Sequence, residues 1–134
     1  ADLDALSTLE SACRLKRMTL TPLVAPSSTP ERIEQISKHA SGFVYMLARA
    51  GVTGARSEAP EIGARVHALR AVTKLPVGVG FGISTAAHVA AVAKHADGAI
   101  VGSALVKYLD EVHRNGGDVL DAAERFVSEL RPVQ

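Results

Sequence analysis

The sequence has few of the residues that disulfides, metal centres and aromatic stacking surfaces require. It contains one cysteine, Cys13, no tryptophan, and only 4% aromatic residues. A lone cysteine cannot form an internal disulfide and has no second thiolate for a metal site. Its apolar helical spacing favours a packed thiol over a nucleophile. We therefore expect a protein of a reducing compartment, the cytoplasm, whose fold does not depend on disulfides.

The sequence also lacks an excess of charge and any long apolar run. Fifteen Lys and Arg residues against fourteen Asp and Glu residues give a net charge of +1, which provides no electrostatic ground for a nucleic-acid partner. The densest basic group, Arg14, Lys16 and Arg17, is typical of a solvated helix end. No apolar run approaches the length of a membrane span, and no signal-peptide pattern is present. We expect neither nucleic acid nor membrane as a partner.

Acid–base groups are scarce where a buried site would need them. No Asp or Glu falls on a predicted strand. Asp2 is most simply a helix N-cap, and Glu58 and Glu61 are typical of solvent-facing charges near a loop. The five histidines lie on or at the ends of predicted helices, where surface or boundary roles are usual: His39, His67, His88, His95 and His113. No pair of them has the context of a metal site, so we expect no metal.

What the sequence does contain is an alternation of strand-like and helix-like segments. Apolar segments predict strands at residues 19–25, 43–48, 76–81 and 99–101. Helical periodicity predicts helices at residues 3–15 and 103–113, and after residues 30, 60, 84 and 118. Short connections between alternating elements predict an α/β fold with a parallel sheet and right-handed crossovers. The strands are apolar almost throughout, which is typical of a sheet covered on both faces. We expect one domain over residues 1–134.

Local signals set several boundaries. Ser28 with Glu31 has the spacing of a capping box, and Ser84 is predicted to be the N-cap of the fourth helix. Asp118 is expected to cap the last helix, with Ala122, Phe126, Val127 and Leu130 facing inward. A long, polar, glycine-containing loop, expected to be mobile, covers residues 49–59.

Glycines follow three of the predicted strands. They lie in Gly51-Val52-Thr53-Gly54, in Gly80-Phe81-Gly82-Ile83-Ser84 and in Gly102-Ser103. The carboxyl ends of parallel strands are where sites of barrels and open α/β sheets lie, and helices begin soon after two of these glycines. Glycine lets backbone N–H groups approach an anion, and helix N-termini attract it. The pattern favours phosphate binding, although each glycine alone would suit a tight turn.

Longer motifs resemble a known family. Pro22-Leu23-Val24-Ala25-Pro26, the segment GFVYMLARAGVTG at residues 42–54, GFGIS at residues 80–84 and GAIVGSA at residues 98–104 resemble, in order, the fifth to eighth strands of tryptophan synthase α subunits. The resemblance implies a (β/α)8 TIM barrel, of which this chain would form the C-terminal half, since a whole barrel needs about 250 residues. The chain departs from the family at Asp4, where a proline is usual.

The resemblance also implies an activity. The family is a lyase of tryptophan biosynthesis that cleaves indole-3-glycerol phosphate to indole and glyceraldehyde 3-phosphate without a cofactor, and passes indole to a β subunit that holds pyridoxal phosphate. Another phosphate-binding lyase or isomerase barrel is the alternative family. The close match of Gly51-Val52-Thr53-Gly54 disfavours it.

Site residues are assigned by the same resemblance. The substrate phosphate would be bound by the backbone amides of Gly54, Gly82, Gly102 and Ser103, and by the Ser103 hydroxyl. The indole pocket would be lined by Val24, Tyr45, Phe81 and Ile100. Thr53 would close over the site with its loop and hydrogen-bond a catalytic aspartate.

That aspartate, and the glutamate that acts with it, belong in the family to the second strand and the loop after it, which precede everything in this sequence. We therefore expect this chain alone to be inactive. Three possibilities stay open: an enzyme completed by another chain, a non-catalytic phosphate-binding half barrel, and a structural fragment. Open barrel edges predict self-association or pairing with an N-terminal half.

Overall fold

Four parallel strands form the centre of the protein. The computed structural model describes residues 3–48, 59–80 and 82–131. Its strands are β1 (Leu23–Val24), β2 (Val44–Leu47), β3 (Val77–Gly80) and β4 (Gly98–Ile100). They form one sheet in the order β1-β2-β3-β4, and each neighbouring pair is parallel. The prediction of an α/β fold with a parallel sheet is confirmed.

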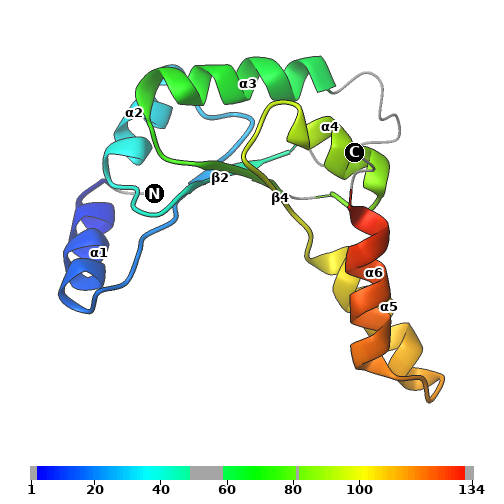
Figure 1. The fold of residues 1–134 in the computed structure, drawn as a ribbon. Coiled ribbons are helices and arrows are strands. Elements are labelled where there is room, and N and C mark those ends of the chain that lie inside the picture. Colours follow the sequence, from blue (N-terminus) through cyan, green and yellow to red (C-terminus); the bar gives the residue numbers. More distant parts are fainter. Residues whose placement is uncertain (1–2, 49–58, 81, 132–134) are drawn as a thin grey trace.

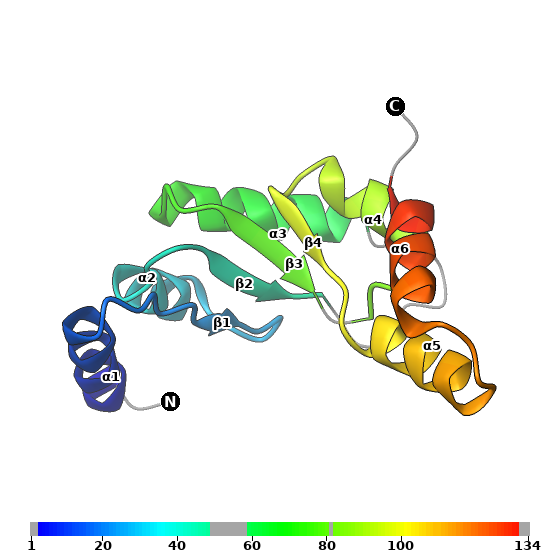
Figure 2. The same cartoon turned by 60° about the horizontal axis from the view of Figure 1, so that its bottom comes forward.

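Helices alternate with these strands. They are α1 (Leu3–Leu15), α2 (Pro30–Lys38), α3 (Ala59–Val72), α4 (Ala86–Ala93), α5 (Ser103–Arg114) and α6 (Val119–Leu130). Figure 1 shows α2, α3 and α4 along one side of the sheet, while α1 at one end and α5 with α6 at the other project toward the opposite side. Figure 2 shows the same arrangement from below, with the sheet lying between the two projecting ends. Within the part described, no helix has the length and apolarity needed to cross a membrane.

The first strand is shorter than predicted. Only Leu23 and Val24 pair with β2, opposite Tyr45 and Met46. Pro22 has no N–H to donate, so it contributes only its carbonyl, which accepts from Tyr45 N–H. Upstream of it, the backbone N–H of Leu20 donates to the Ser41 hydroxyl and its carbonyl accepts from Ser41 N–H. Before Pro22, the backbone groups of Leu20 are therefore hydrogen-bonded to Ser41 in a loop, and not to a neighbouring strand.

Two helix caps lie one residue beyond their predicted places. Thr29, not Ser28, caps α2 by accepting from Arg32 N–H, whereas the Ser28 hydroxyl accepts from Ala25 N–H in the preceding turn. Thr85, not Ser84, caps α4 in the same way. In both pairs the hydroxyl directly before the helix, on an extended backbone, reaches the free N–H groups. The Asp118 cap of α6 is confirmed.

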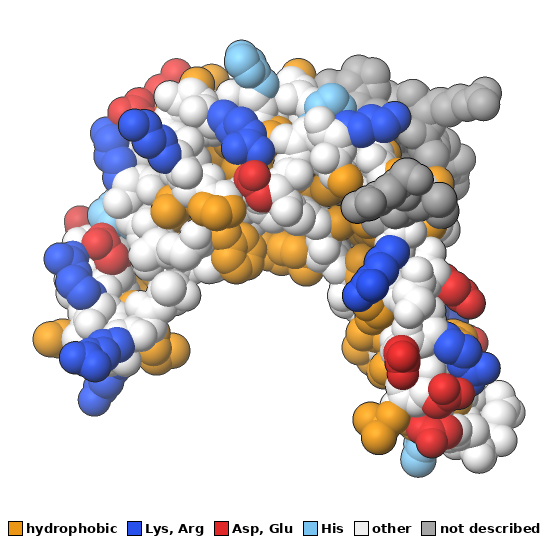
Figure 3. Space-filling model, viewed as in Figure 1, with side chains coloured by type: hydrophobic (Ala, Val, Ile, Leu, Met, Phe, Trp, Pro, Cys, Tyr) orange, Lys and Arg blue, Asp and Glu red, His pale blue; other side chains and the backbone are white. Residues whose placement is uncertain are grey.

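The two faces of the sheet differ in what covers them. Val24, Met46 and Val79 share one row and are at most 2% exposed, because they pack against the helices. The row next to it contains Leu23, which is 56% exposed. Figure 3 shows apolar side chains gathered on the open underside between the projecting ends. Both faces are apolar, as predicted, but the described helices cover only one of them.

The helices at the two projecting ends bury fewer apolar side chains than their helical periodicity predicted. In α6, Ala122 is buried, and Phe126 stacks on Tyr108 of α5 with ring centroids 5.4 Å apart, but Val127 is half-exposed. The helix α1 makes few contacts with the other helices and strands. Its Glu10 carboxylate lies 2.7 Å from Nδ1 of His39 at the end of α2. This histidine is a boundary residue, as predicted, and it links two helices.

Asp97 joins the starts of β3 and β4. Its Oδ2 accepts from the Val77 backbone N–H at 2.8 Å and from the Arg70 guanidinium at 3.0 Å. The Asp97 N–H in turn donates to the Val77 carbonyl. The Val77 hydrogen bond, followed by that from Arg70, lowers the pKa of the Asp97 carboxyl. Asp97 thus fixes the register of β4 against β3 by hydrogen bonds to both backbone groups of Val77.

Asp97→Ala should lower the free energy of unfolding by about 1 kcal/mol, because Val77 N–H loses its acceptor. The effect falls at the low end of the usual range because the Asp97 side chain is 44% exposed, so water replaces part of the bond. Asp97→Asn keeps an acceptor oxygen and should cost less. Urea unfolding of the unmodified chain and the two variants measures both differences. Equal losses in the two variants would show that the acceptor oxygen at position 97 does not stabilise the protein.

The contribution of the Asp97 charge should depend on pH. A carboxyl whose pKa is lowered by folding stabilises the protein above its unfolded pKa, and this stabilisation is lost as the pH falls through the folded pKa. The difference in unfolding free energy between the unmodified chain and Asp97→Asn should therefore be complete above pH 3.8 and shrink below it. A difference that stays constant across that range would show that the charge has no role.

Candidate functional site

The open face of the sheet is shaped by an aromatic ring over a glycine. A Cβ placed on Gly80 would overlap the Tyr45 hydroxyl, and would lie 2.6 Å from Tyr45 Cζ and 3.0 Å from Ile100 Cβ. Gly80 and Ile100 are partners in the register of β3 and β4. The absence of a side chain at Gly80 therefore lets Tyr45 lie across β3 toward Ile100. These three residues form a continuous surface on the open face.

A second glycine on β3 repeats this arrangement nearer the start of the strands. A Cβ on Gly78 would lie 2.9 Å from Ile100 Cδ1 and 3.2 Å from Phe43 Cε2. Below this contact a hollow of about 500 Å³ is bounded by residues at the starts of β2, β3 and β4, among them Phe43, Pro76, Gly78, Gly98 and Ile100. The open face is consequently apolar and concave, which suits the flat apolar part of a ligand.

Just beyond the carboxyl ends of β3 and β4, glycines leave the backbone open to solvent. Gly82, just beyond β3, has φ +80°, and a Cβ there would meet nothing within 4 Å. Gly102, just beyond β4, is equally open and precedes α5 without a side-chain cap. Ser103 is the first residue of α5 and is exposed. Because Gly80 and Ile100 are register partners, both loops leave the same edge of the sheet. Exposed N–H groups at such an edge can bind an anion.

The structure brings together part of the predicted site. Tyr45 and Ile100 lie on the open face, and Gly82, Gly102 and Ser103 lie at the adjoining edge. Val24 is not brought there: it faces the helices, is 2% exposed, and lines a separate cavity with Met46. The predicted residues Thr53, Gly54 and Phe81, and the predicted loop 49–59 up to residue 58, lie outside the described residues.

Sequence reasoning missed the residues that shape this face. Leu23 occupies the place expected for Val24, because the register sets Leu23 opposite Tyr45. Phe43, Gly78 and Gly80 were also not assigned to a pocket. Their signal is the spacing of two residues along a strand, which places Phe43 with Tyr45 and Gly78 with Gly80 on one face. Within the described ranges, no cluster of three or more His, Cys, Asp or Glu residues could hold a metal ion.

Comparison with known proteins identifies the family. The family model described as "Tryptophan synthase alpha chain" matches residues 2–133. The chain belongs to this family. The tryptophan synthase alpha chain of Citrifermentans bemidjiense is 43% identical over 129 residues, which cover 91% of this chain and 48% of the relative. That of Chloroflexus aggregans is 44% identical with the same coverage.

Solved structures agree with the sequence relatives. Tryptophan synthase subunit alpha from Campylobacter jejuni superposes with a TM-score of 0.80 at 34% identity, covering 97% of this chain and 50% of that chain. A tryptophan synthase structure from Mycobacterium tuberculosis gives 0.76 at 43% identity, covering 95% and 46%. The chain thus spans about half the length of the relatives it matches. The four parallel strands and six helices of the described residues correspond to about half of the TIM barrel of tryptophan synthase alpha chains.

The contact between Tyr45 and Gly80 can be tested by a double-mutant cycle. Gly80→Ala should lower the free energy of unfolding by about 1–3 kcal/mol, because the new methyl group meets the Tyr45 ring. In a Tyr45→Ala background the same change should cost much less, since the ring is gone. Urea unfolding of the four proteins measures the coupling.

Gly98→Ala provides the matched control for this cycle. Gly98 lies in the same sheet, and a Cβ there would meet nothing within 4 Å. The substitution should therefore change the unfolding free energy by no more than about 0.5 kcal/mol. Additive costs of Gly80→Ala and Tyr45→Ala would show that the two residues do not touch.

Proposed function

We propose that this chain forms the C-terminal half of a tryptophan synthase α barrel, with β1 to β4 as its fifth to eighth strands, in a single domain over residues 1–134. In this role it binds the phosphate and part of the indole ring of indole-3-glycerol phosphate, or the product glyceraldehyde 3-phosphate. The observation that carries the proposal is the shared edge of the sheet: Gly82 and the Gly102-Ser103 helix start follow Gly80 and Ile100, which are register partners, and Tyr45 lies against Gly80. An anion site next to an apolar concave face matches a phosphate joined to an aromatic ring.

Each part of the substrate has a counterpart in this half. The amides of Gly82, Gly102 and Ser103, with that of Gly54 from the loop, hold the phosphate, and the Ser103 hydroxyl adds a further donor. The ring lies against Tyr45, Phe81 and Ile100. Leu23 takes the place first assigned to Val24, because Leu23 is on the open face. Thr53 closes over the bound substrate with its loop.

The lyase chemistry needs groups that this half does not bring. Retro-aldol cleavage requires a proton delivered to the indole ring and another removed from the glycerol hydroxyl by groups within hydrogen-bond reach. The family resemblance assigns these roles to a Glu and an Asp in the other half of the barrel. Activity therefore belongs to the completed barrel, and the indole product passes to the β subunit, which carries the pyridoxal phosphate.

Phosphate binding can be mapped on this chain alone. Titration with glycerol phosphate should shift the NMR signals of the Gly82, Gly102 and Ser103 amides first, because their N–H groups contact the anion. Ser103→Ala should weaken binding about three- to tenfold through loss of one hydroxyl donor. Ser128→Ala, at an exposed serine of α6, is the matched control and should leave the affinity unchanged. Shifts centred on Arg14, Lys16 and Arg17 would instead indicate nonspecific charge attraction.

Association and activity should be linked. Within the described part of the chain, β1 and β4 are the outer strands of the sheet and pair with no further strand, and the open face is apolar. The 134-residue polypeptide should therefore self-associate, as measured by light scattering, and produce no indole. Missing general acid and base catalysis costs about 10²–10⁴-fold for each group. Addition of a separately produced N-terminal half should replace the self-association and restore indole formation. A monomer that cleaves indole-3-glycerol phosphate unaided would refute the proposal.

A further inference from the structure

The loop from β3 to α4 carries Gly82, which belongs to the proposed phosphate site. Gly82 has φ +80° and is exposed, and three residues connect it to the helix. The first of these, Ile83, is 8% exposed and belongs to the hydrophobic core. The next two, Ser84 and Thr85, are polar and exposed. Packing therefore fixes one residue of the connection, and the orientation of Gly82 depends on what holds the polar part.

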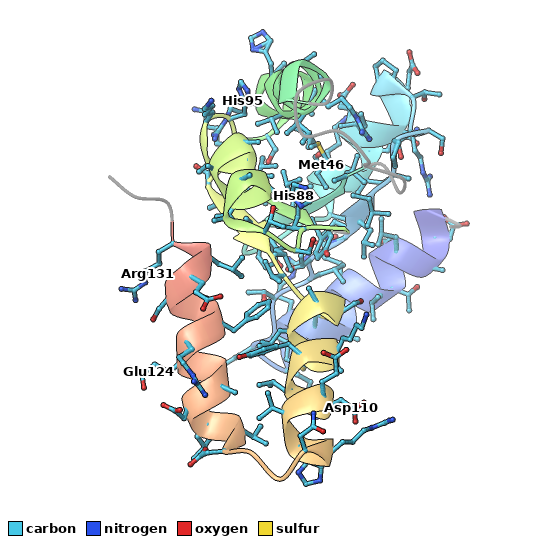
Figure 4. The ribbon with its side chains drawn as sticks, turned by 90° about the vertical axis from the view of Figure 1, so that its right-hand side faces the viewer. Met46, His88, His95, Asp110, Glu124 and Arg131 are labelled. Atoms are coloured by element: carbon cyan, nitrogen blue, oxygen red, sulfur yellow. The ribbon has the colours of Figure 1, made fainter. Side chains whose placement is uncertain are left out.

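A histidine of α4 holds this polar part by two hydrogen bonds. The backbone N–H of Ser84 donates to Nδ1 of His88 at 3.3 Å, and the backbone N–H of His88 donates to the Thr85 hydroxyl at 3.2 Å. Figure 4 labels His88 and His95 at opposite ends of α4, and His88 is at the end that follows the loop. The two bonds run in opposite directions, as in a capping box. Here the ring reaches one residue further, to the residue before the cap.

The bond made by the ring acts on the loop and not on the helix. Thr85 already caps α4, and Ser84 lies outside the helix. Without an acceptor in the protein, the Ser84 N–H would bind water and the backbone around it could rotate more freely. The ring of His88 removes that freedom two residues from Gly82. It also occupies the Ser84 N–H, so the contribution of this loop to an anion site is left to Gly82.

The hydrogen bond defines the protonation of the ring. A backbone N–H can only donate, so Nδ1 of His88 is the unprotonated acceptor and the ring proton lies on Nε2. The loop after β4 is held differently, because Gly102 precedes α5 without a side-chain cap. Of these two parts of the proposed phosphate site, the Gly82 part is the one that depends on a side chain.

We propose that His88 is a positioning residue for phosphate binding. Its neutral ring, with Nδ1 as acceptor, holds Ser84 so that the Gly82 amide is in place before the anion arrives. The role rests on the proposed function, since phosphate is the ligand of the site that Gly82 joins. His88 does not touch the anion. It acts by reducing the conformational freedom that the loop loses on binding, which raises the affinity.

The proposal can be tested by NMR titration of variants with glycerol phosphate. His88→Leu removes the acceptor and should weaken binding about three- to tenfold, the effect of one neutral hydrogen bond. His88→Asn places an amide oxygen at the position of Nδ1 and should restore most of the lost affinity. His67→Leu makes the same change at an exposed histidine of α3 and should leave the affinity unchanged. Circular dichroism of each variant checks that the fold is intact.

Two further measurements separate positioning from a general effect on stability. Nitrogen-15 spectra of the unmodified chain at about pH 8, where histidine is ordinarily neutral, should show the ring proton of His88 on Nε2. In His88→Leu the amide signals of Ser84 and Gly82 should move, while that of Ser103 should keep its position and its shift at saturating glycerol phosphate. A loss of stability alone would not divide the two loops in this way.

The outcomes distinguish this proposal from the proposed function. Equal affinities of the unmodified chain and His88→Leu would overturn the role of His88 and leave the phosphate site standing. A ring proton on Nδ1 would overturn it as well. Failure of His88→Asn to restore binding would show that the ring acts through its bulk and not through its acceptor. Absence of saturable binding by the unmodified chain would overturn the proposed function, and the role of His88 with it.

Discussion

The register between β1, β2, β3 and β4 is the constraint on which the rest of the structure depends. Side chains alternate between the two faces of a strand, so a shift of one residue would exchange the faces. The Tyr45 N–H donates to the Pro22 carbonyl at one end of the sheet, and Asp97 binds Val77 at the other. These contacts decide that Met46 packs under the helices and that Tyr45 faces the open side. Both the core and the candidate site follow from this choice.

The two faces are built from different kinds of residue. On the helix side, Val24, Val44, Met46, Val77 and Val79 fill the space under the helices, and each is at most 2% exposed. On the open side β3 carries only glycines, so the rings of Phe43 and Tyr45 extend over it. One strand pattern thus produces a dense core on one face and a shallow concave surface on the other.

Sequence alone was sufficient for the order and type of the elements, because each apolar strand and each helical stretch carries its own periodicity. It failed where a decision depends on a neighbour distant in the chain. Leu23 and Val24 are both apolar strand residues, and only pairing with Tyr45 shows which one faces a ligand. The roles of Asp97 and His39 likewise rest on partners far away in sequence. The predicted caps fell one residue before Thr29 and Thr85 because a serine precedes each threonine. Both residue types are favoured at an N-cap, so the local sequence does not distinguish them. Motif resemblance identified the family, since it uses many residues at once.

The sequential strand order has a consequence for how the chain acquires its structure. Among the described residues, each strand pairs with the strand before it and the strand after it along the chain, and with no other. Each pairing therefore closes only the loop of one β/α unit, and the entropy lost on closure grows slowly with the length of that loop. A β/α unit emerging from the ribosome can dock on the one already made. The sheet can therefore grow during synthesis, one unit at a time, in the direction of translation.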